Sequence, residues 1–315
     1  MAIKDKAASA LARLHTKAAA IGESYQQTLL LFCQEELMRR IALSPYADKL
    51  ILKGGLFLYL AMNHSGRTTM DADFLLRNLS NDEATIRTML GRIIAAPTEN
   101  EYVTFDVLGL KPIALQQQYH GMQASIVARI KRVRVPLFVD FGIGDVIVPS
   151  PEIRTLCPLL PDNTAPQILT YSLESTIAEK YDAIVQRMEQ TSRMKDFFDI
   201  CNLSRTFPFH GATLQRAMRE TLAHRGTHHD AKTFSYVEKL ASMPEMHRKW
   251  LFFNRSLSSA AMPFDEAMQQ IILFLKPVVA TIVADGDFKL SWVPGQGWHV
   301  MPQNKNAPKG GMPQK

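Results

Sequence analysis

The spacing of apolar residues divides the chain into regions of different predicted structure. Residues 5–44 are rich in Ala, Leu, Gln, Glu and Arg and contain no proline, which predicts helix. Within them, residues 25–43 place apolar side chains at helical spacing. In the stretch LILKGGLFLYLAM, apolar residues surround Gly54 and Gly55. This pattern predicts a helix or strand, a tight backbone passage at the glycines, and then a helix.

Short runs rich in Val, Ile and Phe follow, and these predict strands. The first begins at Asp71 and ends at Leu76, and three more cover 102–108, 122–130 and 133–141. A helix is expected between them at 81–95, with Ser80 or Asn81 as its N-cap.

From about residue 168 the composition becomes helical. Apolar residues fall on one face of 172–189, and further helices are expected at 194–206, 214–222 and 265–284. Strands mixed with helices and then helices alone predict an α+β fold with a mostly helical second lobe. We expect a helical segment at 1–45, a core at 46–161, a helical lobe at 162–284 and a loosely ordered tail at 285–315.

Composition narrows the class of protein. Hydrophobic residues make up 46% and charged residues 21%, a balance typical of a folded globular chain. The net charge of +6 is compatible with a phosphate-rich partner, although it also favours solubility alone. The three cysteines are far apart and lack CxxC spacing, which argues against disulfides or zinc and for a cytoplasmic location. Apolar runs are too short to predict a membrane span.

The first candidate chemistry lies in KGGLFLYLAMNHSGRTTMDADF. On a strand, Asp71 and Asp73 point to the same face, so their carboxylates can converge on a divalent cation such as Mg²⁺. Gly54 and Gly55 would let the backbone approach a triphosphate without a Cβ in the way. The alternative is that the aspartates mark a solvated strand end.

A second carboxylate signal is Asp140, which follows a run of apolar residues on a predicted strand. It is either a third carboxylate for the metal, an orienting base for an acceptor hydroxyl, or a strand-end aspartate that bonds the next turn. Gly142, Gly144 and Asp145 are predicted to form that turn.

Charged residues also gather in the helical stretch 175–200. Glu179 and Lys180 lie on its first helix, and the next helix begins with Arg193, Lys195, Asp196 and Asp199. Taken singly, these are solvated charges. Taken with the carboxylates, the cations would supply positive charge to a triphosphate held between two lobes.

Two further clusters remain open to interpretation. The histidines of HRGTHHD could bind a metal, but Gly226 interrupts the helix and a fourth ligand is not evident, so a solvated loop is favoured. The basic run between two strands is either an exposed hairpin turn or an RNA phosphate contact; its members are Arg129, Lys131, Arg132 and Arg134.

The order of these motifs resembles the AbiEii/AbiGii nucleotidyltransferase toxins, which include the MenT-like toxins of bacterial toxin–antitoxin pairs. The resemblance covers about residues 30–205 and rests on GG, R-x-T-x-D-x-D, a strand aspartate followed by GxGD, AEK, and RxKDxxD. It implies a polymerase-β-like nucleotidyltransferase core with a mixed sheet, plus a mostly helical second lobe. Thr69 stands where many members have serine and keeps the hydroxyl.

The resemblance also implies roles for individual residues. The expected nucleotide-binding residues are Gly54, Gly55, Arg67, Thr69, Lys180, Arg193 and Lys195. The expected ligands of Mg²⁺ or Mn²⁺ are Asp71, Asp73 and Asp140. The expected catalytic set is Asp71, Asp73, Lys180 and Asp196.

The implied activity is transfer of a nucleotide from an NTP to an acceptor, most simply the 3′ end of tRNA or of another RNA. Such transfer blocks aminoacylation and translation, and a cognate antitoxin restrains the toxin. The residues leave open a different acceptor, either a protein hydroxyl (AMPylation) or a small molecule. A non-catalytic module is disfavoured because Asp71 and Asp73 are both present.

Overall fold

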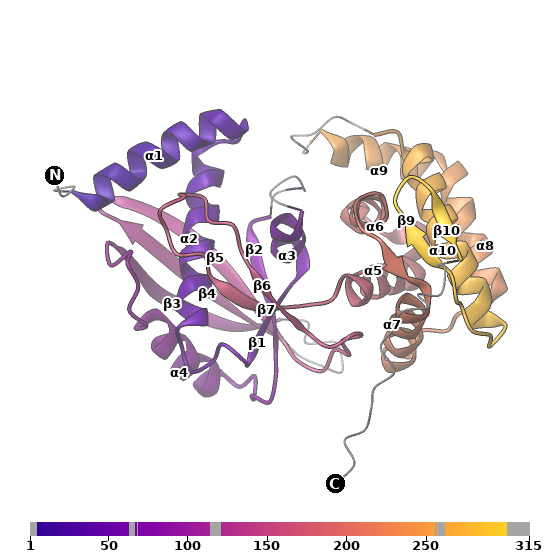
Figure 1. The fold of residues 1–315 in the computed structure, drawn as a ribbon, viewed down its shortest axis with the longest axis horizontal. Helices are drawn as coiled ribbons and strands as arrows, with labels where there is room; N and C mark the ends of the chain where they lie inside the picture. Colours follow the sequence, from indigo (N-terminus) through magenta and orange to yellow (C-terminus); the bar gives the residue numbers. More distant parts are fainter. Residues whose placement is uncertain are drawn as a thin grey trace, which may run out of the picture.

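The computed structural model describes residues 5–62, 67, 69–113, 121–255, 257 and 262–300, and these form two lobes (Figure 1). The helices are α1 (Lys6–Ile21), α2 (Tyr25–Ala42), α3 (Gly54–Ala61), α4 (Glu83–Ile94), α5 (Leu173–Arg187), α6 (Met194–Thr206), α7 (Gly211–His224), α8 (Ala231–Lys239), α9 (Pro244–Asn254) and α10 (Phe264–Val283). The strands are β1 (Leu50–Lys53), β2 (Asp71–Leu76), β3 (Val103–Ile113), β4 (Gly121–Ile130), β5 (Val133–Gly142), β6 (Glu152–Thr155), β7 (Gln167–Thr170), β8 (Phe209–His210), β9 (Ser291–Val293) and β10 (Gly297–His299).

The first lobe is built on a seven-stranded sheet in the order β3-β4-β5-β2-β1-β7-β6. Strands β2 and β5 run parallel, as do β1 and β7, and the other neighbours are antiparallel. A mixed sheet joined to a helical lobe confirms the predicted α+β class.

Helices α2 and α4 cover one face of this sheet. Along β5, Val135, Leu137 and Val139 are buried toward these helices, while Pro136 and Phe138 between them are exposed. Because side chains alternate along a strand, the opposite face of β5 is open to solvent. This alternation leaves room for a ligand on the sheet itself.

The core lobe extends beyond the expected boundary at residue 161. Strand β7 pairs with β1 in the same sheet, so the core ends near Thr170 instead. The strand that pairs with β7 is distant in sequence, and the four residues QILT are too short a run to predict a strand by themselves.

The expectation of a loosely ordered tail from residue 285 is wrong for residues 291–299. Strands β9 and β10 pair with each other, and β9 pairs with β8. Trp292 is buried, and its Nε1 donates a hydrogen bond of 2.5 Å to the Ser204 carbonyl. Trp298 stacks on Phe274 of α10, so two aromatic anchors order a segment whose glycines and prolines suggested a loop. Residues 301–315 lie outside the described residues.

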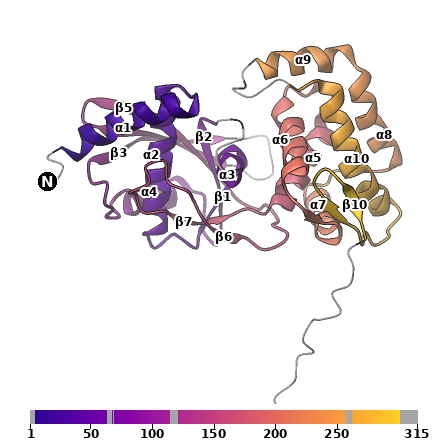
Figure 2. The same ribbon diagram turned by 45° about the horizontal axis from the view of Figure 1, so that its top comes forward.

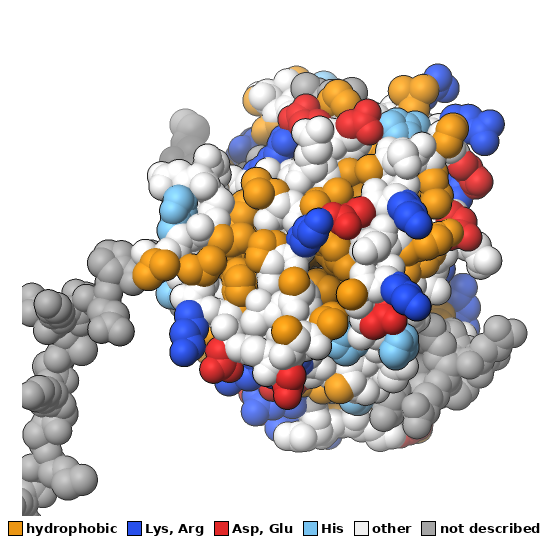
Figure 3. All heavy atoms as spheres, turned by 90° about the vertical axis from the view of Figure 1, so that its right-hand side faces the viewer, with side chains coloured by type: hydrophobic (Ala, Val, Ile, Leu, Met, Phe, Trp, Pro, Cys, Tyr) orange, Lys and Arg blue, Asp and Glu red, His pale blue; other side chains and the backbone are white. Residues whose placement is uncertain are grey.

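The helical lobe packs around α10, whose inward face is buried from Phe264 to Ile282. By length and apolar composition α10 is the single membrane-span candidate within the described ranges, a test that core helices of soluble proteins also pass. The absence of a membrane span therefore stays a prediction. Figure 3 shows apolar side chains on this end of the molecule, and the exposed ones include Leu251, Phe252 and Leu273.

Helices α5, α6, α7 and α10 match the predicted helices, whereas α8 and α9 were not predicted. Helix α8 begins at a capping box between Asp230 and Thr233, and α9 has Pro244 in its first turn. Both are valid start signals, but the helices are short, at 9 and 11 residues, so each offers only about two to three turns over which a helical period can be recognised.

Candidate functional site

Strand register brings the predicted carboxylates together on the sheet. Asp73 of β2 lies opposite Asp140 of β5 in the parallel pair and opposite Lys53 of β1 in the antiparallel pair. Asp71 is two residues earlier on β2 and shares the same face. Three carboxylates from two strands therefore line one surface, as the D-x-D spacing and the strand aspartate predicted.

This carboxylate group carries negative charge that its surroundings do not cancel. Burial raises the pKa of Asp73, and the charges of Asp140 and Asp71 raise it further against the lowering effect of Lys53. Burial also raises the pKa of Asp140, although Gln123 donates a hydrogen bond of 2.8 Å to it. Repulsion between carboxylates of this kind is relieved by a bound cation.

The glycine pair allows the backbone to pass close to these groups. Gly54 has φ of +70°, and a Cβ there would overlap the Asp73 carboxylate. A Cβ on Gly55 would lie 3.0 Å from the Thr69 hydroxyl oxygen and 3.2 Å from Nη1 of Arg67. Helix α3 begins at Gly54 without a side-chain cap, so its first N–H groups remain available for an anion.

Across the site from the carboxylates, lysine and arginine side chains form ion pairs with two aspartates of the helical lobe. Lys180 of α5 is buried and lies 3.1 Å from Asp196 and 2.6 Å from Asp199. Arg67 of the core lobe donates two hydrogen bonds to Asp199, at 3.0 and 2.9 Å. Arg193 lies 2.6 Å from Asp196. Asp196 and Asp199 therefore fix the positions of the cations and link the two lobes.

Lys195 differs from its neighbours in how its charge is compensated. Within the described part of the chain it makes no ion pair. Burial lowers its pKa, and the nearby charges of Arg193, Arg67 and Lys180 lower it further against the raising effect of Asp196. A buried cation among other cations is stabilised by an anionic ligand such as a phosphate.

A second ionic group beside the site was not predicted. Lys53 forms ion pairs with Asp145 and, at 3.0 Å, with Glu179. Arg225, at the end of α7, lies 3.0 Å from Asp145, 3.1 Å from Glu179 and 3.1 Å from Asp182. Burial alone would lower the pKa of Lys53, but Glu179 and Asp145 outweigh it and raise that pKa. Asp145 thus joins the lobes instead of only forming a turn.

Signals for these residues were present in the sequence but were assigned to other features. Lys53 directly precedes the glycine pair, and Arg225 lies in HRGTHHD, whose histidines are the more conspicuous candidate ligands. His228 is exposed and lies 3.6 Å from Asp230, in agreement with a solvated loop.

A cavity of about 310 Å³ between the lobes collects most of the expected residues (Figure 2 shows the two lobes). Those that line it are Gly54, Gly55, Arg67, Asp73, Lys180, Arg193, Lys195 and Asp196. Asp71 and Asp140 lie beside Asp73 on the sheet, and the Thr69 side chain lies close to Gly55. The roles assigned to these residues stay predictions.

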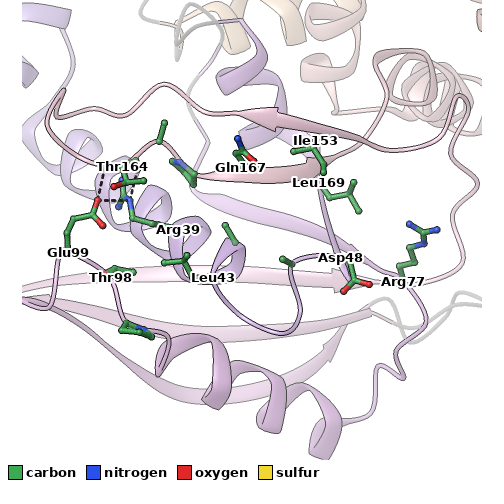
Figure 4. Close-up of a pocket in the computed structure, with 15 residues that line it drawn as sticks. Arg39, Leu43, Asp48, Arg77, Thr98, Glu99, Ile153, Thr164, Gln167 and Leu169 are labelled. Carbon is green, nitrogen blue, oxygen red and sulfur yellow. Dashed lines mark hydrogen bonds and ion pairs between the residues drawn. The ribbon is translucent and has the colours of Figure 1, made fainter.

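A larger cavity, of about 870 Å³, lies elsewhere on the core lobe (Figure 4). Arg39 is a buried charge on its wall and is fully engaged by Glu35, Glu36 and the Thr164 carbonyl. Volume therefore does not identify the site, because the larger cavity lacks buried charge in need of a partner.

The carboxylate group fits an open cation site. No three His, Cys, Asp or Glu side chains among the described residues gather closely enough to hold a metal by themselves. Mg²⁺, however, is commonly bound by one or two carboxylates together with waters and substrate phosphates. Asp71 and Asp73, with Asp140 adjacent, match that open arrangement.

Most of the chain is similar to a described protein family. Residues 36–270 match the family model described as the nucleotidyl transferase AbiEii toxin of a Type IV toxin–antitoxin system. No curated protein matches the chain.

Two solved structures from Helicobacter pylori resemble the chain, each at 14% sequence identity. One, described as a candidate nucleotidyltransferase, has a TM-score of 0.47 and covers 83% of this chain and 96% of its own. The other, JHP933, has a TM-score of 0.46 and covers 83% of this chain and 94% of its own.

Proposed function

Because the chain belongs to the AbiEii family of nucleotidyltransferase toxins, we propose that it transfers a nucleotide from an NTP to the 3′ end of tRNA. It does so in the cytoplasm and thereby blocks translation. The toxin–antitoxin family implies a cognate antitoxin as partner. The observation that carries the proposal is the cavity between the lobes, which is lined both by the Asp73 carboxylate on β2 and by the cations Lys180 and Lys195 on α5 and α6.

The NTP is bound in the cavity between the lobes. Lys195 and Lys180 contact its phosphates, with Arg193 alongside, and the N-terminus of α3 approaches from the sheet side. Asp196 holds two of these cations in place, which reduces the conformational entropy lost on binding. The glycines at the start of α3 let the phosphates lie against the backbone.

Asp71 and Asp73 would hold Mg²⁺ or Mn²⁺, with Asp140 beside them. When bound, the ion supplies activation of the acceptor hydroxyl and neutralisation of the leaving pyrophosphate. Asp140, oriented by Gln123, accepts the proton of the acceptor hydroxyl. The hydroxyl oxygen bonds to the α-phosphorus, and the bond from that phosphorus to the pyrophosphate oxygen breaks.

The test is to incubate the pure protein with each labelled NTP, Mg²⁺ and total tRNA, and to sequence tRNA 3′ ends after induction in cells. Added nucleotides at tRNA 3′ ends are expected. Label on protein or on a small molecule alone would identify a different acceptor and overturn the tRNA assignment. Asp71→Ala should abolish both transfer and growth arrest. Asp287→Ala, an exposed aspartate in the helical lobe, is the matched control and should retain both.

A further inference from the structure

The open face of the sheet forms a continuous surface that ends at the carboxylates. Pairing places residues of β3, β4, β5 and β2 in four rows across this face. From the carboxylate end outward the rows are Lys111–Gln123–Asp140–Asp73, Gly109–Ser125–Phe138–Asp71, Asp106–Val127–Pro136, and Thr104–Arg129–Arg134. From Asp140 to Arg134 the surface extends about 20 Å along β5.

An exposed aromatic ring lies next to the reacting groups. Phe138 is 38% exposed and is the direct strand partner of Asp71. Its own row continues with Ser125 and Gly109, which are small side chains that leave space above the sheet. A ring in this position can stack with a planar group placed over the carboxylates.

Apart from Asp71, Asp73 and Asp140 at the carboxylate end, the charge left on this face after pairing is positive. Arg129 neutralises Asp106 at 2.6 Å. Arg134 at the outer end and Lys111 beside Asp140 are exposed and form no ion pair within the described ranges of the chain. Arg132 of the adjoining hairpin is likewise exposed, while Lys131 is paired with Asp5. Unpaired cations at both ends favour a partner with a regularly charged backbone.

We infer that this face binds the single-stranded 3′ segment of the acceptor RNA. The terminal base stacks on Phe138, which sets the terminal hydroxyl at Asp71 and Asp140, and the preceding nucleotides run along β5 toward Arg134. Single-stranded RNA is the occupant that matches both features, since bases stack on sheet aromatics and phosphates pair with the flanking cations. This inference rests on the proposed function, and it identifies the surface of the protein that binds the RNA acceptor.

The test compares Phe138→Ala, Phe138→Trp and Arg134→Ala with two controls. The controls are Phe252→Ala, an exposed aromatic on α9, and Arg92→Ala, an exposed cation on α4 on the covered side of the sheet. The readouts are binding of a fluorescein-labelled single-stranded RNA with a tRNA 3′ end, and the separate KM values for RNA and NTP.

Phe138→Ala should weaken RNA binding by about 5- to 100-fold, as expected for one lost base stack. The KM for NTP should stay the same, and Phe138→Trp should restore binding. Arg134→Ala should weaken binding and reduce the slope of log affinity against log salt by about 1. Both controls should bind RNA like the wild type.

The outcomes separate this inference from the proposed function. If the wild type labels RNA and neither Phe138→Ala nor Arg134→Ala changes the KM for RNA, the surface is wrong and the activity stands. If the wild type neither binds nor labels any RNA, the proposed function fails and the surface fails with it. If Phe138→Ala lowers the melting temperature, Arg134→Ala, which removes an exposed side chain, decides the result through its salt slope.

Discussion

Two groups of charged residues, one on α2 in the core lobe and one in the cleft between the lobes, look alike in sequence and differ in how completely they are paired. On α2, Glu36 accepts hydrogen bonds from Arg39, Arg40 and Asn100, all of them buried. Glu35 binds Arg39 and also the Leu159 N–H. In the cleft, Asp73 and Lys195 form no ion pair among the described residues.

The difference shows that buried charge does not by itself identify a site. Charged side chains whose donors and acceptors are all matched stabilise the fold. Here Arg39 and Glu35 of α2 form hydrogen bonds to the backbone of Thr164 and Leu159. A group with a surplus of one sign lowers stability and binds a ligand of the opposite sign. The comparison predicts that variants on α2 change stability and variants in the cleft change activity.

Asp73→Asn should give the largest effect on activity. Removing a carboxylate from the cation site should lower kcat by about 10⁴-fold, or about 5 kcal/mol. The raised pKa of Asp73 means that its ionised form destabilises the fold at pH values above that pKa. The unfolding free energy of Asp73→Asn at neutral pH should therefore equal or exceed that of the wild type. Single-turnover kinetics and urea denaturation measure the two quantities, and a loss of stability would contradict the assignment.

Arg39→Met should show the opposite behaviour. It leaves Glu35 without its cation and Glu36 with one fewer, and breaking a buried pair in this way costs about 3–5 kcal/mol of unfolding free energy. The kcat of the remaining folded protein should not change. Arg87→Met, which removes an exposed pair with Glu83 on α4, is the control and should cost about 0.5 kcal/mol or less. Equal losses in the two variants would show that the α2 group does not stabilise the fold.

Lys195→Gln should have the smallest effect of the three. Loss of one charge-assisted contact to phosphate should raise the KM for NTP by about 10- to 100-fold, or about 1.5–3 kcal/mol. The lowered pKa of Lys195 means that it loses its proton at a lower pH than an ordinary lysine. NTP affinity of the wild type should therefore decrease as pH rises through that pKa, and the variant should lack this step. A pH profile of the KM for NTP that is identical in both proteins would exclude Lys195 from phosphate binding.

The sequence predicted those parts of the site that depend on local spacing. Asp71 and Asp73 share a face because they are two residues apart on a strand, and Asp140 follows a run of apolar residues. Gly54 stood out because the chain passes there from a strand directly into a helix. Each of these inferences needed only neighbours along the chain.

Contacts between distant segments could not be predicted in this way. Lys53 and Glu179 are 126 residues apart, and Arg67 and Asp199 are 132 apart. Each of these charges reads as solvated on its own segment, and only the packing of α5 and α6 against the core gives it a partner. The strand β7 and the ordered residues 291–299 were missed for the same reason, because their partners lie far away in the sequence.

The parallel pairing of β2 with β5 has a consequence for a growing polypeptide. Asp73 reaches Asp140 only after the intervening hairpin has folded back, and Lys180 arrives later still, with the first helix of the second lobe. A nascent or truncated chain that lacks these later segments therefore lacks Asp140, Lys180 or both from the site. A host that makes this toxin is therefore exposed to the assembled site only after the first helix of the second lobe has been translated.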